Sequence, residues 1–222
     1  MSTYVLMRIL ESAPKRYDAG IGLLTLGAVG RAYDRLVSRI PEGARVIDIG
    51  CGTGALTLRA ARRGACVKGI DVNPEMLERA RERVRAAGLE ARVELVEMGV
   101  AELDREERES YDVVVSGLCF SELSPDEQRY ALRQVARLLR ADGLLLVADE
   151  VRPSGPVARA AQRLLRAPLV AITYLITQQT THPVSGLPER IAESGLRIES
   201  QRSSALGGFI EIVARRAGAG PG

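Results

Sequence analysis

Short apolar runs alternate with amphipathic helical patterns through the middle of the chain. Strand-like runs cover residues 45–50 (RVIDIG) and 66–71 (CVKGID), and a helical pattern over 55–63, closed by Gly64, lies between them. A strand, a helix and a second strand in this order predict a βαβ unit with two parallel strands.

The best-defined helix follows the second of these strands. Asn73 suits its N-cap, Pro74 suits its first helical position, and Gly88 supplies the expected stop. One apolar stripe at helical spacing is formed by Met76, Ala80, Val84 and Ala87. This stripe should therefore pack against the sheet.

The alternation continues as far as residue 149. We expect strands over 92–97, 112–116 and 144–149 and a helix over 125–139. Because strands and helices alternate along the chain, the pattern predicts a doubly wound, mostly parallel α/β sheet.

The two ends of the chain depart from this alternation. The strand-like runs 196–202 and 208–216 are joined through SSALG and predict an antiparallel hairpin. The first forty residues carry helical patterns (YVLMRILE and VGRAYDRLVSRI). We therefore expect an N-terminal helical cap over 1–40, one domain over 41–216 and a flexible tail over 217–222.

The composition narrows the class of protein. With 222 residues, of which 46% are hydrophobic and 27% charged, the chain suits one globular domain. A net charge of +3 spread among many acids gives little support for a nucleic-acid partner. The apolar stretch 164–176 contains Arg166 and Pro168 and is too short to span a bilayer.

The three cysteines bear on the compartment. Cys51, Cys66 and Cys119 stand apart without C-x-x-C spacing, and no signal peptide precedes them. We expect reduced thiols, a cytoplasmic location and no metal site.

A glycine-dense turn, Asp48 to Ala55 (DIGCGTGA), joins the first strand to the first helix. As G-x-G-x-x-A it satisfies the relaxed dinucleotide fingerprint, so the turn alone is a weak signal. Asp71 lies 21 residues after Gly50, at the end of the second strand, where a carboxylate can accept both hydroxyls of a ribose. Dinucleotides and S-adenosylmethionine both contain that ribose, so the acid does not choose between them.

Three features together resemble the class I S-adenosylmethionine-dependent methyltransferases. The turn extends to D-x-G-x-G-x-G, the segments 111–123 (YDVVVSGLCFSEL) and 138–150 (LLRADGLLLVADE) look like that family's fourth and fifth strands, and the chain ends in a hairpin. The resemblance implies a Rossmann-like, seven-stranded sheet in the order 3-2-1-4-5-7-6. It also implies S-adenosylmethionine as cofactor and S-adenosylhomocysteine as product.

The resemblance also assigns cofactor contacts to this chain. The turn residues Asp48, Gly50, Cys51, Gly52 and Gly54 would surround the methionine moiety. Asp71 would bind the ribose, Val72 and Met76 would line one adenine face, and Ser116 would lie beside the sulfonium. Alternatively, Val72 and Met76 belong only to helix–sheet packing.

One stretch departs from the family's pattern. Where many relatives end the third strand with Gly-Asp-Ala, this chain has Met98, Gly99 and Val100. Without that Asp, we expect backbone groups and apolar contacts to hold the adenine.

The acceptor is less clearly indicated. After the fourth strand the chain has SGLC (116–119) in place of the N/D-P-P-Y/F run of exocyclic-amine methyltransferases that act on nucleic acids and on some proteins. Candidate catalytic residues are Tyr17, Glu122 and His182, and each has a structural alternative. The region 155–190 is expected to cover the substrate.

The resemblance is to the branch with the ubiquinone and menaquinone C-methyltransferases, so we expect a small, lipophilic or aromatic acceptor. Similarity to corrinoid protein-associated methyltransferases indicates a corrinoid protein as one candidate partner. A second copy of this chain, in a homodimer, is the other. The alternatives are an NAD-dependent oxidoreductase and a non-catalytic S-adenosylmethionine-binding protein that acts with a corrinoid protein.

Overall fold

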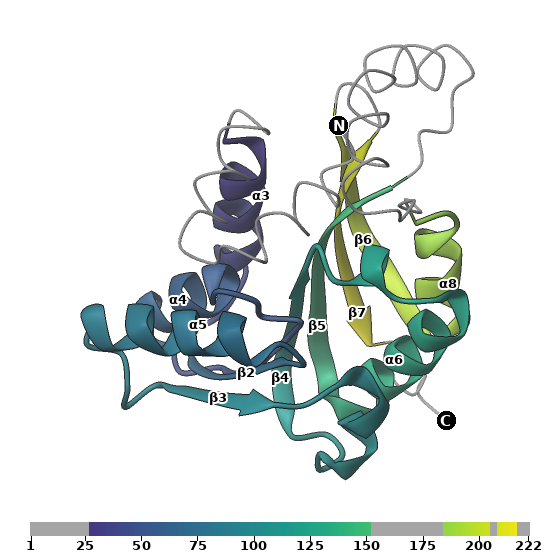
Figure 1. Ribbon diagram of the computed structural model, residues 1–222. Helices are drawn as coiled ribbons and strands as arrows, with labels where there is room; N and C mark the ends of the chain where they lie inside the picture. Colours follow the sequence, from purple (N-terminus) through teal and green to yellow (C-terminus); the bar gives the residue numbers. More distant parts are fainter. Residues whose placement is uncertain (1–26, 152–183, 205–207, 217–222) are drawn as a thin grey trace, which may run out of the picture.

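Seven strands form one twisted sheet in the computed structural model, which describes residues 27–151, 184–204 and 208–216 (Figure 1). The order β3-β2-β1-β4-β5-β7-β6 is the one predicted. The strands are β1 (Arg45–Ile49), β2 (Cys66–Asp71), β3 (Val93–Glu97), β4 (Tyr111–Gly117), β5 (Leu139–Glu150), β6 (Leu196–Ser203) and β7 (Phe209–Arg216). Only β7 runs antiparallel to its neighbours, β5 and β6, which confirms the terminal hairpin.

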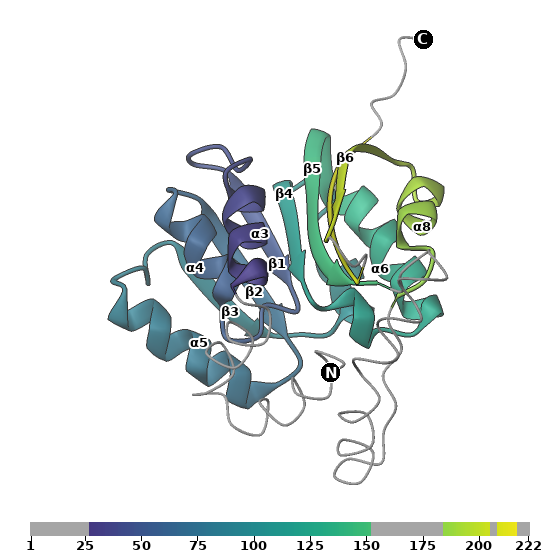
Figure 2. The same cartoon turned by 90° about the horizontal axis from the view of Figure 1, so that it is seen from above.

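Helices cover both faces of the sheet (Figure 2). They are α3 (Ala28–Val37), α4 (Ala55–Arg62), α5 (Pro74–Ala86), α6 (Pro125–Leu138) and α8 (Leu187–Glu193), with short 3-10 turns η1 (Val100–Arg105) and η2 (Phe120–Glu122). Alternate strand residues point to opposite faces. Val46 and Val113 pack with α3 and α4, whereas Ile47 and Val114 pack with α6 and α8.

Capping side chains fix the starts of two helices. The Asn73 side chain accepts the backbone N–H groups of Glu75 and Met76, at 3.0 and 3.2 Å, and so caps α5. At α6, Ser124 and Glu127 form a reciprocal capping box. Both helices therefore start where the sequence predicts.

Two elements differ from the prediction. β5 begins at Leu139 and not at Leu144, because Leu139 pairs with Tyr111 and the intervening turn forms an irregularity in which Asp142 has φ 62°. Helix α8 was not predicted. It begins within the last residues of the region 155–190, which was assigned to the substrate cover and not to a separate helix. None of the described helices is long and apolar enough to cross a membrane.

The domain boundaries stay a prediction. Of the proposed cap over 1–40, the described part contains α3, and the tail over 217–222 lies outside the described residues. Most of the proposed cover over 155–190 lies outside them as well.

Candidate active site

A cavity of about 390 Å³ lies at the carboxyl ends of β1, β2 and β4. In a doubly wound sheet this edge, near the point where the strand order reverses, is where ligands bind. Four chain segments and one residue of α6 line the cavity: Ile49, Gly50 and Gly52; Ile70, Asp71, Val72, Asn73 and Met76; Met98, Gly99, Val100 and Ala101; Gly117, Leu118, Cys119, Glu122 and Leu123; and Glu127.

The glycine loop needs its glycines for different reasons. Gly50 and Gly52 have φ values of 69° and 52°, in the left-handed region that other residues rarely adopt. A Cβ on Gly50 would stand 2.5 Å from the Cys119 sulfur, so Gly50 lets two walls of the cavity meet. A Cβ on Gly52 would meet no atom within 4 Å, because the loop there faces open space.

Asp71 joins the end of β2 to the glycine loop. One carboxylate oxygen accepts the Gly52 N–H and the other accepts the Asn73 N–H, both at 2.8 Å. Burial raises the pKa of this carboxyl, while these two N–H groups oppose the shift. The side chain is partly buried and lines the cavity, and its contact with a ribose stays a prediction.

Four predicted contacts lie behind the cavity wall and do not line it. They are Asp48, Cys51, Gly54 and Ser116. The Ser116 hydroxyl is fully buried and donates to the Ile49 carbonyl at 3.0 Å, and its place beside the sulfonium stays a prediction. Gly54 starts α4 with φ 78°, and a Cβ there would stand 3.3 Å from Ala80 of α5, so helix packing explains this glycine.

Asp48 is a buried carboxylate beneath the loop. Its Oδ2 accepts the Thr57 hydroxyl at 2.6 Å, while Oδ1 is buried without a hydrogen-bond partner. Burial raises the pKa of Asp48 to about 7. The carboxyl therefore joins the end of β1 to α4, and its contact with the methionine moiety stays a prediction.

The segment after β3 lines the cavity at Met98, Gly99 and Val100. Gly99 has φ −91° and ψ 166°, an ordinary extended conformation that any residue adopts. Of the two predicted adenine contacts, Met76 is buried and Val72 is 69% exposed. Met76 thus both packs under α5 and borders the cavity.

The opposite wall is the segment 117–123, which the sequence identified only in part. Glu122 lines the cavity, whereas Leu118, Cys119 and Leu123 were not assigned to the site. Burial raises the pKa of the Cys119 thiol, so it is not a ready nucleophile. Tyr17 and His182, the other catalytic candidates, lie outside the described residues.

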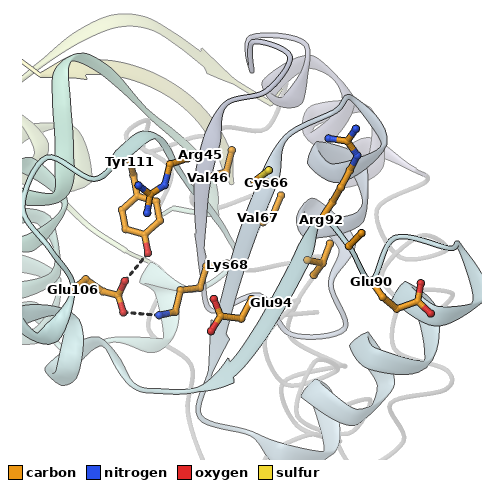
Figure 3. A pocket seen from close by; sticks show the side chains of 12 residues that line it. Arg45, Val46, Cys66, Val67, Lys68, Glu90, Arg92, Glu94, Glu106 and Tyr111 are labelled. Carbon is orange, nitrogen blue, oxygen red and sulfur yellow. Dashed lines mark hydrogen bonds and ion pairs between the residues drawn. The ribbon is translucent and has the colours of Figure 1, made fainter.

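A second hollow, of about 370 Å³, opens at the opposite edge of the sheet (Figure 3). Its central charges are already paired: Lys68 contacts Glu106 at 2.7 Å, and the Tyr111 hydroxyl donates to the same carboxylate. Burial and the Glu106 carboxylate raise the pKa of Tyr111. Because the amino edge of a parallel sheet is not where such folds bind ligands, we place the active site at the carboxyl edge.

Comparison with known proteins shows the family. Residues 46–143 match a family described as a methyltransferase domain. A phosphatidylethanolamine N-methyltransferase of Cereibacter sphaeroides is 38% identical over 151 residues, which cover 68% of this chain and 71% of that protein. A ubiquinone/menaquinone biosynthesis C-methyltransferase of Hahella chejuensis is 29% identical over 160 residues, covering 69% of this chain but less than two thirds (63%) of that relative.

A solved structure shows the same fold. Geranyl diphosphate C-methyltransferase from Streptomyces coelicolor A3(2), in complex with Mg²⁺, geranyl diphosphate and S-adenosyl-L-homocysteine, has a TM-score of 0.66 at 14% identity and covers 91% of this chain and 82% of that chain.

The strand order, the glycine loop and the acid at the end of β2 define a class I methyltransferase fold. The chain belongs to the S-adenosylmethionine-dependent methyltransferases, and S-adenosylmethionine is its cofactor. The dinucleotide alternative is therefore set aside.

Proposed function

We propose that the protein transfers a methyl group from S-adenosylmethionine to a small lipophilic molecule, and that an amine-bearing lipid is the acceptor. The observation that carries the proposal is the lining of the cavity beside segment 117–123. Leu118 and Leu123 give it an apolar surface, and Glu122 and Glu127 give it carboxylates. Among the described lining residues there is no lysine, arginine or histidine, which favours a cationic or neutral group over an anionic one.

The described residues fit the cofactor. Open space beside Gly52 lets the loop backbone approach a ligand closely. Each Asp71 oxygen accepts one N–H and keeps a further acceptor position for a ribose hydroxyl. Val72, Met76 and the segment 98–100 offer the apolar surface for adenine. We assign the methionine end to Gly50 and Gly52, the ribose to Asp71 and the adenine to that surface.

Methyl transfer requires mainly that the acceptor nucleophile, the methyl group and the sulfur lie in line. The cofactor supplies a methyl group on a cationic sulfonium, and the transfer is an in-line displacement. An ammonium acceptor must lose a proton before its nitrogen can attack. In this proposal the Glu122 carboxylate attracts the ammonium and takes that proton, while Leu118 and Leu123 hold the adjoining apolar chain.

Two relatives support a lipophilic acceptor with different nucleophiles. The name of the Cereibacter relative contains a lipid amine, and that of the Hahella relative contains a quinone. The carboxylates favour the amine. A cytoplasmic location, a corrinoid-protein partner and a homodimer stay predictions.

A product assay with radiolabelled S-adenosylmethionine tests the proposal. Phosphatidylethanolamine in detergent micelles should become labelled on nitrogen. Phosphatidylethanol, the matched lipid whose headgroup lacks the amine, should not become labelled. Because Glu122 takes the proton, Glu122→Gln should lower kcat about a hundredfold or more, in the usual range for a lost acid–base group, and leave binding of S-adenosylhomocysteine unchanged. Calorimetry with S-adenosylhomocysteine distinguishes a wrong acceptor from a wrong activity. If the protein binds S-adenosylhomocysteine but labels no lipid, the proposed acceptor is wrong. If it does not bind S-adenosylhomocysteine, the proposed methyltransferase activity is wrong.

A further inference from the structure

The wall formed by segment 117–123 has a strained backbone. Leu118 has φ 60° and is 5% exposed. In this left-handed conformation the Cβ of an L-residue crowds the following carbonyl oxygen, which is why residues other than glycine avoid it. Such a conformation persists only when the surrounding structure enforces it, and it is concentrated at functional sites.

A buried carboxylate holds the residues that follow Leu118. Asp149, near the end of β5, is 0% exposed and accepts three backbone N–H groups. Its Oδ2 accepts from Phe120 at 2.8 Å, and its Oδ1 accepts from Ser121 at 3.3 Å and from Glu150 at 2.7 Å. The carboxylate therefore fastens η2 to β5, although it does not line the cavity itself.

Further bonds hold the rest of the segment. The Leu118 N–H donates to the Ala148 carbonyl at 2.8 Å. From α6, the buried Gln128 amide donates to the carbonyls of Phe120 and Leu123, at 2.8 and 2.9 Å. Its oxygen in turn accepts from Arg190 of α8 at 2.8 Å. The segment is thus fixed between β5 and α6, and the strained leucine has little room to relax.

We propose that Asp149 is a positioning residue, which holds segment 117–123 in its strained conformation and thereby sets where the acceptor lies relative to the cofactor. This inference rests on the proposed function, because it takes the surface beside Leu118 and Glu122 as the acceptor site. A carboxylate is well suited to this role because it can accept several N–H groups at once, whereas an amide side chain would turn an N–H toward at least one of them.

Asp149→Asn tests the inference. One of the N–H groups now faces a donor, so η2 should shift. The kcat/KM for micellar phosphatidylethanolamine should fall about tenfold or more, as for a buried N–H group left without its acceptor, while the dissociation constant of S-adenosylhomocysteine changes by less than about threefold. The matched control is Asp112→Asn. Asp112 also accepts a backbone N–H, from Arg45 at 2.8 Å, and contacts Arg140, but it lies at the amino edge. This control should keep wild-type kinetics.

Two results would overturn the inference. One is unchanged acceptor kinetics in folded Asp149→Asn. The other is an equal loss of S-adenosylhomocysteine affinity, because a general destabilisation of the site would weaken the binding of cofactor and acceptor alike.

Hydrogen exchange of the wild-type protein tests the tether without any variant and without any acceptor. The Phe120 and Ser121 amides should be protected at the level of the β5 amides. Exchange at the rate of unprotected loop amides would overturn the inference even if Asp149→Asn fails to fold. If the wild-type protein labels no lipid, the proposed function fails, and this exchange measurement still decides on the tether.

Discussion

The two walls of the cavity are built in different ways. The cofactor wall is local: the loop 50–54 and Asp71 belong to one βαβ unit, and Asp71 binds the loop directly. The acceptor wall, segment 117–123, is held by Asp149 of β5 and Gln128 of α6. Asp149 lies 29 residues along the chain from Phe120, whose N–H it accepts. A wall that is fixed within one motif can be recognised in a sequence, and a wall that is fixed by distant residues cannot.

Each wall also rests on a buried carboxylate, and the two differ in their partners. Asp48, beneath the cofactor wall, has one oxygen without a partner, whereas Asp149 accepts three N–H groups. Burial raises the pKa of each to about 7. Because their partners differ, we expect the Asp48 carboxyl to tolerate an amide and the Asp149 carboxyl to need both of its oxygens as acceptors.

The largest effect is expected at Gly52 in the cofactor wall. Gly52→Val places a branched side chain in the space where backbone meets ligand, so affinity for S-adenosylhomocysteine should fall more than about a hundredfold by calorimetry. The matched control is Gly88→Val, because Gly88 also has a positive φ (65°) and open space around its Cβ but ends α5 away from the cavity. Equal affinity losses in both variants would mean that backbone strain, and not contact between residue 52 and the cofactor, lowers the affinity.

The next effect is expected at Asp71. Asp71→Ala removes the proposed ribose acceptor and the bonds to Gly52 and Asn73, and hydrogen bonds to charged groups contribute roughly 1.5–3 kcal/mol, so affinity should fall about tenfold to a hundredfold. Asp112→Ala, which removes a comparable carboxylate at the amino edge, controls for stability. Full affinity for S-adenosylhomocysteine in folded Asp71→Ala would refute the ribose assignment.

The third effect concerns Asp48 and pH. Because its pKa is about 7 in the folded protein and 3.8 in the reference state, the folded state holds more protons between these values. The free energy of unfolding should therefore fall as pH rises from about 4 to about 7, with Asp48 contributing on the order of 1 kcal/mol per pH unit. Asp48→Asn should remove that contribution and be the more stable protein at pH 8, measured by urea unfolding without cofactor. An unchanged pH slope would show that Asp48 is ionised throughout.

Much of the fold was predictable because its signals are periodic and local. The βαβ pattern, the Asn73 cap and the terminal hairpin all depend on neighbours in sequence, and each is confirmed. The start of β5 was not, since Leu139 joins the strand only through its pairing with Tyr111.

The site was predictable to the same extent. Gly52 and Asp71 line the cavity, and their contacts with the cofactor stay predictions. Gly54 looks identical in sequence to a ligand-facing glycine but packs against Ala80. A serine at the end of a buried strand likewise gives no sign that its hydroxyl turns back to Ile49. The strain at Leu118 has no local signal, because leucine does not favour that conformation and only tertiary contacts impose it.

The smallest effect is expected at Gly99, where the chain departs from its relatives. The ordinary φ of −91° removes backbone strain as an obstacle to Gly99→Asp. The new Cβ would stand 3.2 Å from Val72 Cγ1, a tight contact that the exposed Val72 side chain can relieve by a small shift. The new carboxylate can then accept the adenine amino group, which adds up to about 1.5 kcal/mol.

Glu102 limits this gain. Its carboxylate accepts the Gly99 N–H at 3.1 Å and lies 4.0 Å from the new Cβ, so the two acids repel each other. Gly99→Asp should therefore bind S-adenosylhomocysteine as well as the wild type or up to about tenfold more tightly, and Gly99→Asn, which carries no added charge, measures the repulsion. Calorimetry on both variants decides the point. A tenfold loss in both, with each protein folded, would mean that a side chain at position 99 clashes with the bound cofactor, and that the adenine amino group does not lie where a carboxylate there could accept it.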